Sequence, residues 1–120
     1  MILIIDDETA IRDAVTDILE MVDVTTISAT NGKDGIGLFQ ENHSEIQAIL
    51  LDMRMPIMSG AETYRALRQL DPQIPIILSS GYDDAENTAA FHGDANVKFL
   101  HKPYSIDTLI EMVQATLNHA

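Results

Sequence analysis

Short apolar runs alternate along the chain with longer stretches in which apolar residues recur at helical spacing. The first run, Ile2 to Ile5, has no polar alternation, which is typical of a strand covered on both faces of a sheet. Apolar positions three or four residues apart, as in the stretch after it, indicate a helix with one buried face. The pattern predicts strands at about 2–5, 24–29, 48–51, 75–78 and 96–100, and helices at about 9–21, 33–42, 61–70 and 84–92.

A last helix is expected to begin after Ser105, whose hydroxyl can cap it. Its expected buried side carries Ile106, Leu109, Ile110, Val113 and Leu117. Strict alternation of strands and helices predicts a parallel sheet with helices on both faces. Because crossovers are right-handed and five strands are too few for a closed barrel, we expect an α/β fold with a doubly wound, open, five-stranded parallel sheet.

Composition excludes several classes of protein. Seven basic residues against nineteen acidic ones give a net charge of −12, which argues against direct binding to nucleic acid or to an anionic membrane surface. The chain contains no cysteine, so disulfides, thiolate metal sites and cysteine nucleophiles are excluded. No apolar run approaches the roughly 18 residues of a membrane helix, and the first residues do not form a signal peptide. We expect one acidic domain of 120 residues in the cytoplasm.

Residues that can carry chemistry follow four of the five predicted strands. They are Asp6, Asp7 and Glu8 after the first strand, Asp52 after the third, Ser80 after the fourth and Lys102 after the fifth. Each residue alone has a structural explanation as a strand end, a cap or a turn. In an open parallel sheet, however, the carboxyl ends of the strands meet at one edge, where ligands bind. The joint occurrence therefore favours a functional site.

Clustered carboxylates at this edge would predict a metal site. Two carboxylates ~4 Å apart repel by about 4 kcal/mol near a protein surface, and a divalent cation removes that penalty. Oxygen ligands favour Mg²⁺ over Zn²⁺, with Mn²⁺ as an alternative ion. An aspartate in such a site can act as a nucleophile toward phosphorus and form an acyl phosphate. A lysine and a hydroxyl would help to neutralise the phosphoryl oxygens.

The ordered set resembles the receiver domains of response regulators in two-component signalling. The matching features are Asp6-Asp7, the stretch from Leu51 to Pro56 with Gly60, Ser80 after 76–79, and Lys102-Pro103. They span nearly the whole chain, so the resemblance extends to a single receiver domain over residues 1–120. It implies a flavodoxin-like (βα)₅ fold with strand order 2-1-3-4-5.

The resemblance also implies a role for each matching residue. Asp52 corresponds to the phosphoacceptor, and Lys102 to the lysine that pairs with it and then with the phosphoryl group. Asp6, Asp7, Asp52 and the backbone carbonyl of Arg54 correspond to the Mg²⁺ site. Ser80 corresponds to the switch hydroxyl and Phe99 to the switch aromatic. Arg54 and Tyr82 occupy the two positions that influence dephosphorylation, and Lys102–Pro103 is expected to be a cis peptide bond.

The implied function is signalling rather than metabolic catalysis. A histidine kinase or phosphotransfer protein would pass a phosphoryl group from phosphohistidine to Asp52, and the domain would catalyse its own phosphorylation and dephosphorylation. The helix at 84–92, with its thin apolar face, is then expected to move with the switch. An output domain or effector and a homodimer are further expected partners.

Three alternatives stay open at this point. An aspartyl-phosphate phosphatase of the haloacid-dehalogenase type would use similar chemistry, but Arg54 stands where such enzymes have an acid/base aspartate. An FMN-binding protein of related fold would have to place its phosphate against Asp6, Asp7 and Glu8, which would repel it. A degenerate receiver that only binds partners would not need all five of the site residues present here, which are Asp6, Asp7, Asp52, Ser80 and Lys102.

Overall fold

The computed structural model describes residues 1–81, 91 and 93–118, and its centre is one parallel sheet. The strands are β1 (Ile2–Ile5), β2 (Thr26–Ala29), β3 (Ala48–Asp52), β4 (Ile76–Ser80) and β5 (Val97–His101). They pair in the order β2-β1-β3-β4-β5, and every pair is parallel. The predicted fold class and strand order are therefore confirmed.

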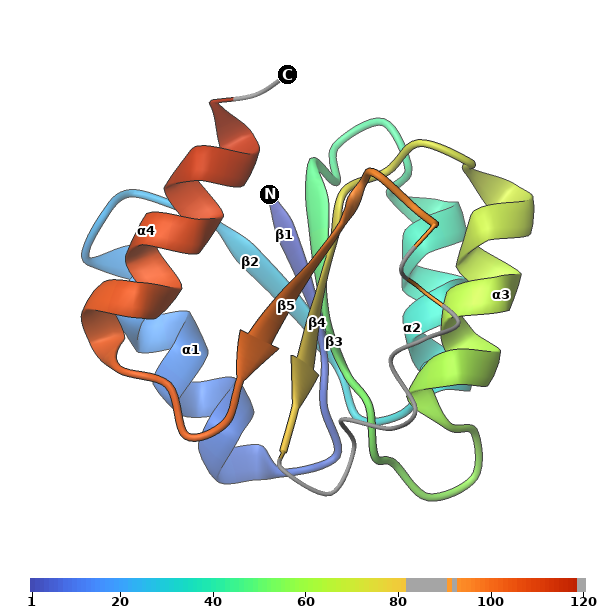
Figure 1. Cartoon of the computed structure of the whole chain (residues 1–120), viewed down its shortest axis with the longest axis horizontal. Helices are drawn as coiled ribbons and strands as arrows, with labels where there is room; N and C mark the ends of the chain where they lie inside the picture. The colour runs from blue at the N-terminus through green and yellow to red at the C-terminus, as the bar shows by residue number, and fades with distance from the viewer. Residues whose placement is uncertain (82–90, 92, 119–120) are drawn as a thin grey trace.

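Helices cover both faces of the sheet. Those described are α1 (Thr9–Glu20), α2 (Gly32–Glu41), α3 (Gly60–Leu70) and α4 (Ile106–Leu117). Figure 1 shows α1 and α4 on one side of the sheet and α2 and α3 on the other. None of these helices is long and apolar enough to cross a membrane. The helix predicted at 84–92 falls almost wholly outside the described residues.

Because strand side chains alternate between the two faces, the sheet divides the core in two. On the α2/α3 face the cluster includes Leu51, Leu78 and Phe39, and on the α1/α4 face it includes Leu50 and Ile77. Strands β1, β3 and β4 are buried along their whole length. This explains why their sequences are continuous apolar runs and not alternating ones.

Several element ends differ from the predicted ones. Strand β2 begins at Thr26 and not at 24, whereas β4 and β5 continue to Ser80 and His101. The side chain of Ser105 accepts a hydrogen bond from the Thr108 N–H, so the predicted cap is confirmed. Ile106 was expected on the buried side of α4 but is 53% exposed, because the first turn of that helix extends past the edge of the core.

Two glycines set how closely α2 approaches its neighbours. A Cβ at Gly35 would lie 2.5 Å from Ile5 Cδ1, and one at Gly32 would lie 2.0 Å from Thr63 Oγ1. The same residues that lower helix propensity therefore let α2 pack closely on β1 and α3. The side chain of Asn31 caps this helix by accepting a hydrogen bond from the Asp34 N–H at 2.8 Å.

An ion pair lies near the amino ends of strands β4 and β5. Arg68 Nε donates to Asp94 Oδ2 at 2.5 Å, and the Tyr64 hydroxyl donates to the same oxygen at 2.6 Å. Arg68 Nη1 also donates to the backbone carbonyls of Asp71 and Ile74. These hydrogen bonds join α3 to the segments that lead into β4 and β5.

Candidate active site at the carboxyl ends of the strands

The acidic and basic residues predicted from the sequence meet at the carboxyl edge of the sheet. Asp52 is the last residue of β3, and Asp6 directly follows β1. The register pairs Ile5 with Leu51, so Asp6 and Asp52 come next to each other at the ends of adjacent strands. Lys102 directly follows β5.

A single ammonium group links two of the carboxylates. Lys102 Nζ donates a hydrogen bond to Asp52 Oδ1 at 3.2 Å and lies 3.7 Å from Asp6 Oδ2. Asp6 is only 4% exposed and Asp52 only 5% exposed. The structure therefore brings together three of the predicted site residues, which are far apart in the sequence.

Burial changes the titration of these groups. It raises the pKa of Asp52 to about 6, with the neighbouring charge of Asp6 as the second cause, and the opposing effect of Lys102 is smaller. The pKa of Asp6 is raised mainly by burial as well. Although burial lowers the pKa of Lys102, the charges of Asp52 and Asp6 outweigh it and hold that pKa above its ordinary value. The ammonium group of Lys102 thus faces two buried carboxylates.

Three consecutive carboxylates, Asp6, Asp7 and Glu8, lie close enough together to hold a metal ion. One oxygen from each lies within 4.8 Å of the others. Asp7 was predicted to belong to the metal site, whereas Glu8 was not, and Asp52 is not a member of this group. The signal for Glu8 was its position as the third consecutive acidic residue after β1. It is the N-cap residue of α1 but makes no side-chain capping hydrogen bond.

Backbone groups hold the two buried carboxylates in place. The Glu8 N–H donates to Asp6 Oδ1 at 2.9 Å, and the Arg54 N–H donates to Asp52 Oδ1 at 3.4 Å. Arg12 Nη1 donates to the Asp6 backbone carbonyl at 2.8 Å, which ties α1 to the end of β1. The metal-ligand role of the Arg54 carbonyl and the role of Tyr82, which lies outside the described residues, stay predictions.

The loop after β3 packs directly against the end of that strand. A Cβ at Gly60 would lie 2.6 Å from the backbone oxygen of Asp52, so only glycine fits at this position. Ser59 and Glu62 form a capping box that starts α3. Ile57, 82% exposed, has a φ of 72°, a strained conformation for a β-branched residue.

The two residues expected to act as a switch lie on neighbouring strands. Ser80 is buried, and its carbonyl accepts a hydrogen bond from the Lys102 N–H at 2.8 Å. By alternation Ser80 follows Leu78 toward the α2/α3 face, where the partly buried Phe99 also packs. The Phe99 ring lies 6.4 Å from that of Phe91. The Lys102–Pro103 peptide bond is cis, as predicted.

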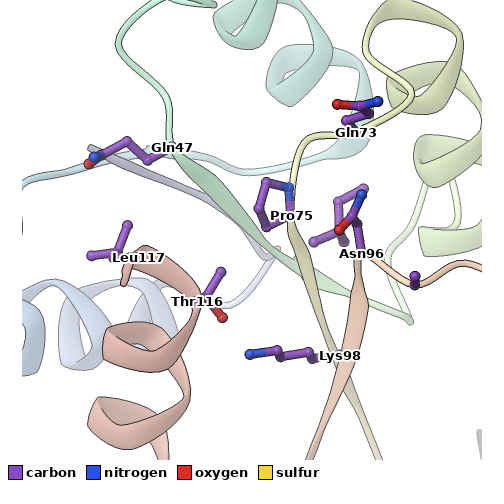
Figure 2. A pocket seen from close by; sticks show the side chains of 9 residues that line it. Gln47, Gln73, Pro75, Asn96, Lys98, Thr116 and Leu117 are labelled. Carbon is purple, nitrogen blue, oxygen red and sulfur yellow. The ribbon is translucent and has the colours of Figure 1, made fainter. Parts of the chain in front are cut away.

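A cavity of about 570 Å³ lies at the opposite edge of the sheet (Figure 2). Its lining includes Gln47, Pro75 and Asn96, which directly precede β3, β4 and β5. Lys98 and Thr116 also line it, from β5 and α4. None of the predicted site residues that the structure describes lines this cavity.

A comparison with protein families identifies the family of the chain. The family model for the response regulator receiver domain matches residues 2–114. The chain is a member of the receiver domain family. Receiver domains are signalling domains of two-component systems, so the family and general function inferred from the sequence are confirmed.

Known proteins agree with this assignment. The receiver domain is 29% identical over 116 residues to the regulatory protein AtoC of Escherichia coli, covering 97% of this chain and 25% of AtoC. It is 30% identical over 117 residues to the autoinducer 1 sensor kinase/phosphatase LuxN of Vibrio campbellii, covering 98% of this chain and 13% of LuxN. The chain thus spans a quarter or less of these two relatives.

Among solved structures, a response regulator receiver domain protein of Clostridium thermocellum superimposes with a TM-score of 0.92 at 27% identity. The alignment covers 98% of this chain and 94% of that one. This similarity extends over the carboxyl edge of the sheet as well as over its core.

Proposed function

We propose that this receiver domain accepts a phosphoryl group on Asp52 from the phosphohistidine of a histidine kinase or phosphotransfer protein, in a reaction that requires Mg²⁺. The observation that supports this most is the placement of Lys102 Nζ between the buried carboxylates of Asp52 and Asp6. A desolvated carboxylate beside a fixed cation is suited to nucleophilic attack on phosphorus.

The transfer exchanges one bond to phosphorus for another. An oxygen of Asp52 bonds to the phosphorus while the bond between phosphorus and the imidazole nitrogen breaks, and the electron pair of that bond stays on the nitrogen. Lys102, which already contacts Asp52 Oδ1 at 3.2 Å, keeps positive charge beside the oxygen that reacts. Its role is electrostatic, because the reaction gathers negative charge in a buried site.

The residues at this edge fit a hard divalent cation. Asp6, Asp7 and Glu8 offer clustered carboxylate oxygens, and the carboxylates of Asp52 and Asp6 are both buried. Asp6, Asp7, Asp52 and the Arg54 carbonyl would hold Mg²⁺, or Mn²⁺ in its place. When bound, the ion supplies positive charge that offsets that of the phosphoryl group.

Two further roles complete the proposal. Ser80 and Phe99 change position when Asp52 gains charge, and this alters the face that a partner contacts. Arg54 and Tyr82 hinder the approach of water to the phosphoryl group and so lengthen its lifetime. An output domain or effector and a second copy of the chain are the proposed targets of the altered face, and the proposed location is the cytoplasm.

The chemistry is tested with phosphoramidate, a small donor whose phosphorus–nitrogen bond resembles that of phosphohistidine. Incubation with this donor and Mg²⁺ is expected to add about 80 Da to the wild-type protein, the mass of one phosphoryl group, in intact mass spectrometry. The Asp52→Asn variant and wild-type protein in EDTA are expected to gain nothing. Asp17→Asn, an exposed site on α1, is the matched control and should load normally.

Two results would contradict the proposal. The first is an unmodified wild-type protein after incubation with donor and Mg²⁺. The second is sustained turnover of p-nitrophenyl phosphate, which would favour the phosphatase alternative over a single slow cycle of phosphorylation.

A further inference from the structure

A second serine lies beside the proposed phosphoacceptor. Ser79, in β4, is 2% exposed. Across residues 1–81, 91 and 93–118, its Oγ is the one buried side-chain nitrogen or oxygen without a hydrogen-bond partner. An unpaired buried donor lowers stability, so native proteins keep few of them and each needs an explanation.

The strand register places this hydroxyl next to Asp52. Asp52 and Ser79 are Cα partners in the β3–β4 pair, and neighbouring strands lie about 4.8 Å apart. The Met53 N–H donates to the Ser79 carbonyl at 2.9 Å and holds this pairing to the end of the ladder.

Alternation puts both side chains on the same face. Leu50 and Ile77 pack in the α1/α4 cluster, and Asp52 and Ser79 each lie two residues further along the same strands. Ser80 points by the same rule toward the opposite face. The serine that matches the family's switch position and the serine that shares a face with Asp52 are therefore different residues.

Asp52 has acceptor positions beyond those used by the donors found in the described part of the chain. A carboxylate has about four acceptor positions, and Lys102 Nζ and the Arg54 N–H both use Oδ1. A change of rotamer at Ser79 would bring its Oγ toward the carboxyl group across the strand pair. We propose that Ser79 donates a hydrogen bond to Asp52 while the bond from Asp52 to phosphorus breaks, and thereby promotes the loss of the phosphoryl group. This inference rests on the proposed phosphorylation of Asp52.

Ser79 is expected to speed hydrolysis because negative charge develops on Asp52 during that reaction. In hydrolysis, the oxygen of water bonds to phosphorus while the bond from phosphorus to Asp52 breaks, and the electron pair stays on Asp52. The protons of the water leave with inorganic phosphate and solvent. The carboxyl group thus changes from an uncharged acyl group to an anion. A hydrogen bond to an anion is roughly twice as strong as one to a neutral oxygen, so the Ser79 donor favours release.

The experiment compares the half-life of the phosphoryl group in four variants after loading with phosphoramidate and Mg²⁺ and removal of the donor. Ser79→Ala is expected to lengthen the half-life about fivefold. Ser79→Thr and Ser79→Val have nearly the same shape and differ in the hydroxyl, so Thr should resemble the wild type and Val should resemble Ala. Ser28→Ala, an exposed strand position, is the matched control and should decay like the wild type.

Thermal unfolding in EDTA separates this role from a structural one. Ser79→Ala should unfold at the same or a higher temperature than the wild type, because an unpaired donor is removed. A half-life in Ser79→Ala within twofold of the wild type, or equal half-lives in the Thr and Val variants, would overturn the inference. Failure of the wild type to load at all would instead overturn the proposed function, so the two failures are distinguishable.

Discussion

The two edges of the sheet use the same kinds of charged side chain in opposite ways. At the amino edge, Arg68 and the Tyr64 hydroxyl both donate hydrogen bonds to Asp94 Oδ2. Burial raises its pKa, but the hydrogen bonds to Arg68 and Tyr64 outweigh burial and hold that pKa below its usual range. At the carboxyl edge, the pKa of Asp52 and that of Asp6 are raised.

The difference shows that the presence of an ion pair does not by itself distinguish a structural cluster from a proposed reaction site. Lys102 contacts two carboxylates, yet it leaves both with raised pKa values. The deciding quantity is the balance between buried charge and the donors that satisfy it. An excess of buried acid lowers stability and is retained where a cation or a reaction needs it.

The largest expected effect comes from breaking the amino-edge pair. Arg68→Met should lower the free energy of unfolding by about 3 kcal/mol, because Asp94 would stay mostly buried without its cation. Arg65→Met, exposed on the same helix, is the matched control and should change the free energy by less than about 0.5 kcal/mol. Urea unfolding at pH 7 measures the free energy of unfolding of both variants. Equal losses in the two variants would show that the Arg68–Asp94 pair does not stabilise the amino edge.

The pH dependence of stability should have opposite signs at the two edges. The raised pKa of Asp52 means that, between about pH 4 and 6, the folded state keeps a proton that the unfolded state has released. Without metal, this residue's contribution should lower the free energy of unfolding by about 2 kcal/mol as pH rises through that window, and the decrease should level off about one pH unit above it.

For Asp94 the sign is reversed. Its lowered pKa stabilises the folded state above about pH 4, and this stabilisation is lost as pH falls below that value. Urea unfolding in EDTA from pH 3 to 7 can separate the two contributions. Asp52→Asn should reduce the loss between pH 4 and 6 by the share that Asp52 contributes, and it should leave the change in stability below pH 4 unchanged. A wild-type curve parallel to that of Asp52→Asn across the window would show that Asp52 titrates normally.

A smaller effect is expected from Mg²⁺ itself. At ten times its dissociation constant the ion should raise the free energy of unfolding by about 1.4 kcal/mol, and EDTA should reverse the gain. Asp7→Asn should reduce this gain and Asp17→Asn should not. A Glu8→Gln variant tests the acidic residue that was not predicted to bind the ion. Equal stabilisation of the wild type and Asp7→Asn by Mg²⁺ would show that Asp7 is not a ligand of the ion.

The fold was predictable because its signals are local and repeated. Continuous apolar runs such as 48–51 identify buried strands without any knowledge of their neighbours. The position of Asp52 at a strand end was predictable for the same reason, since the apolar run stops there. The resemblance to a family then assigned roles that periodicity alone leaves open.

The remaining features depend on contacts between distant parts of the chain. The pairing of Arg68 with Asp94 joins a helix to a loop and has no sequence signature. The lone hydroxyl of Ser79 is visible only when burial and register are known together. Glu8 was named in the acidic run but not among the expected metal ligands, because the resemblance assigns those roles to Asp6 and Asp7. Ile106 was assigned to a buried face because periodicity does not show where the core ends.

The close approach of α2 has a practical consequence for anyone who wishes to engineer a more heat-resistant variant. This helix contains Gly32, Gly35 and Gly37, and replacing a helical glycine with alanine usually favours the folded protein by about 1 kcal/mol. A methyl group added at Gly37 would have nothing within 4 Å, whereas one at either of the other two would collide with Thr63 or Ile5. Of the three glycine-to-alanine substitutions, only the one at Gly37 is thus expected to raise stability, although helix propensity scales alone would rank all three alike.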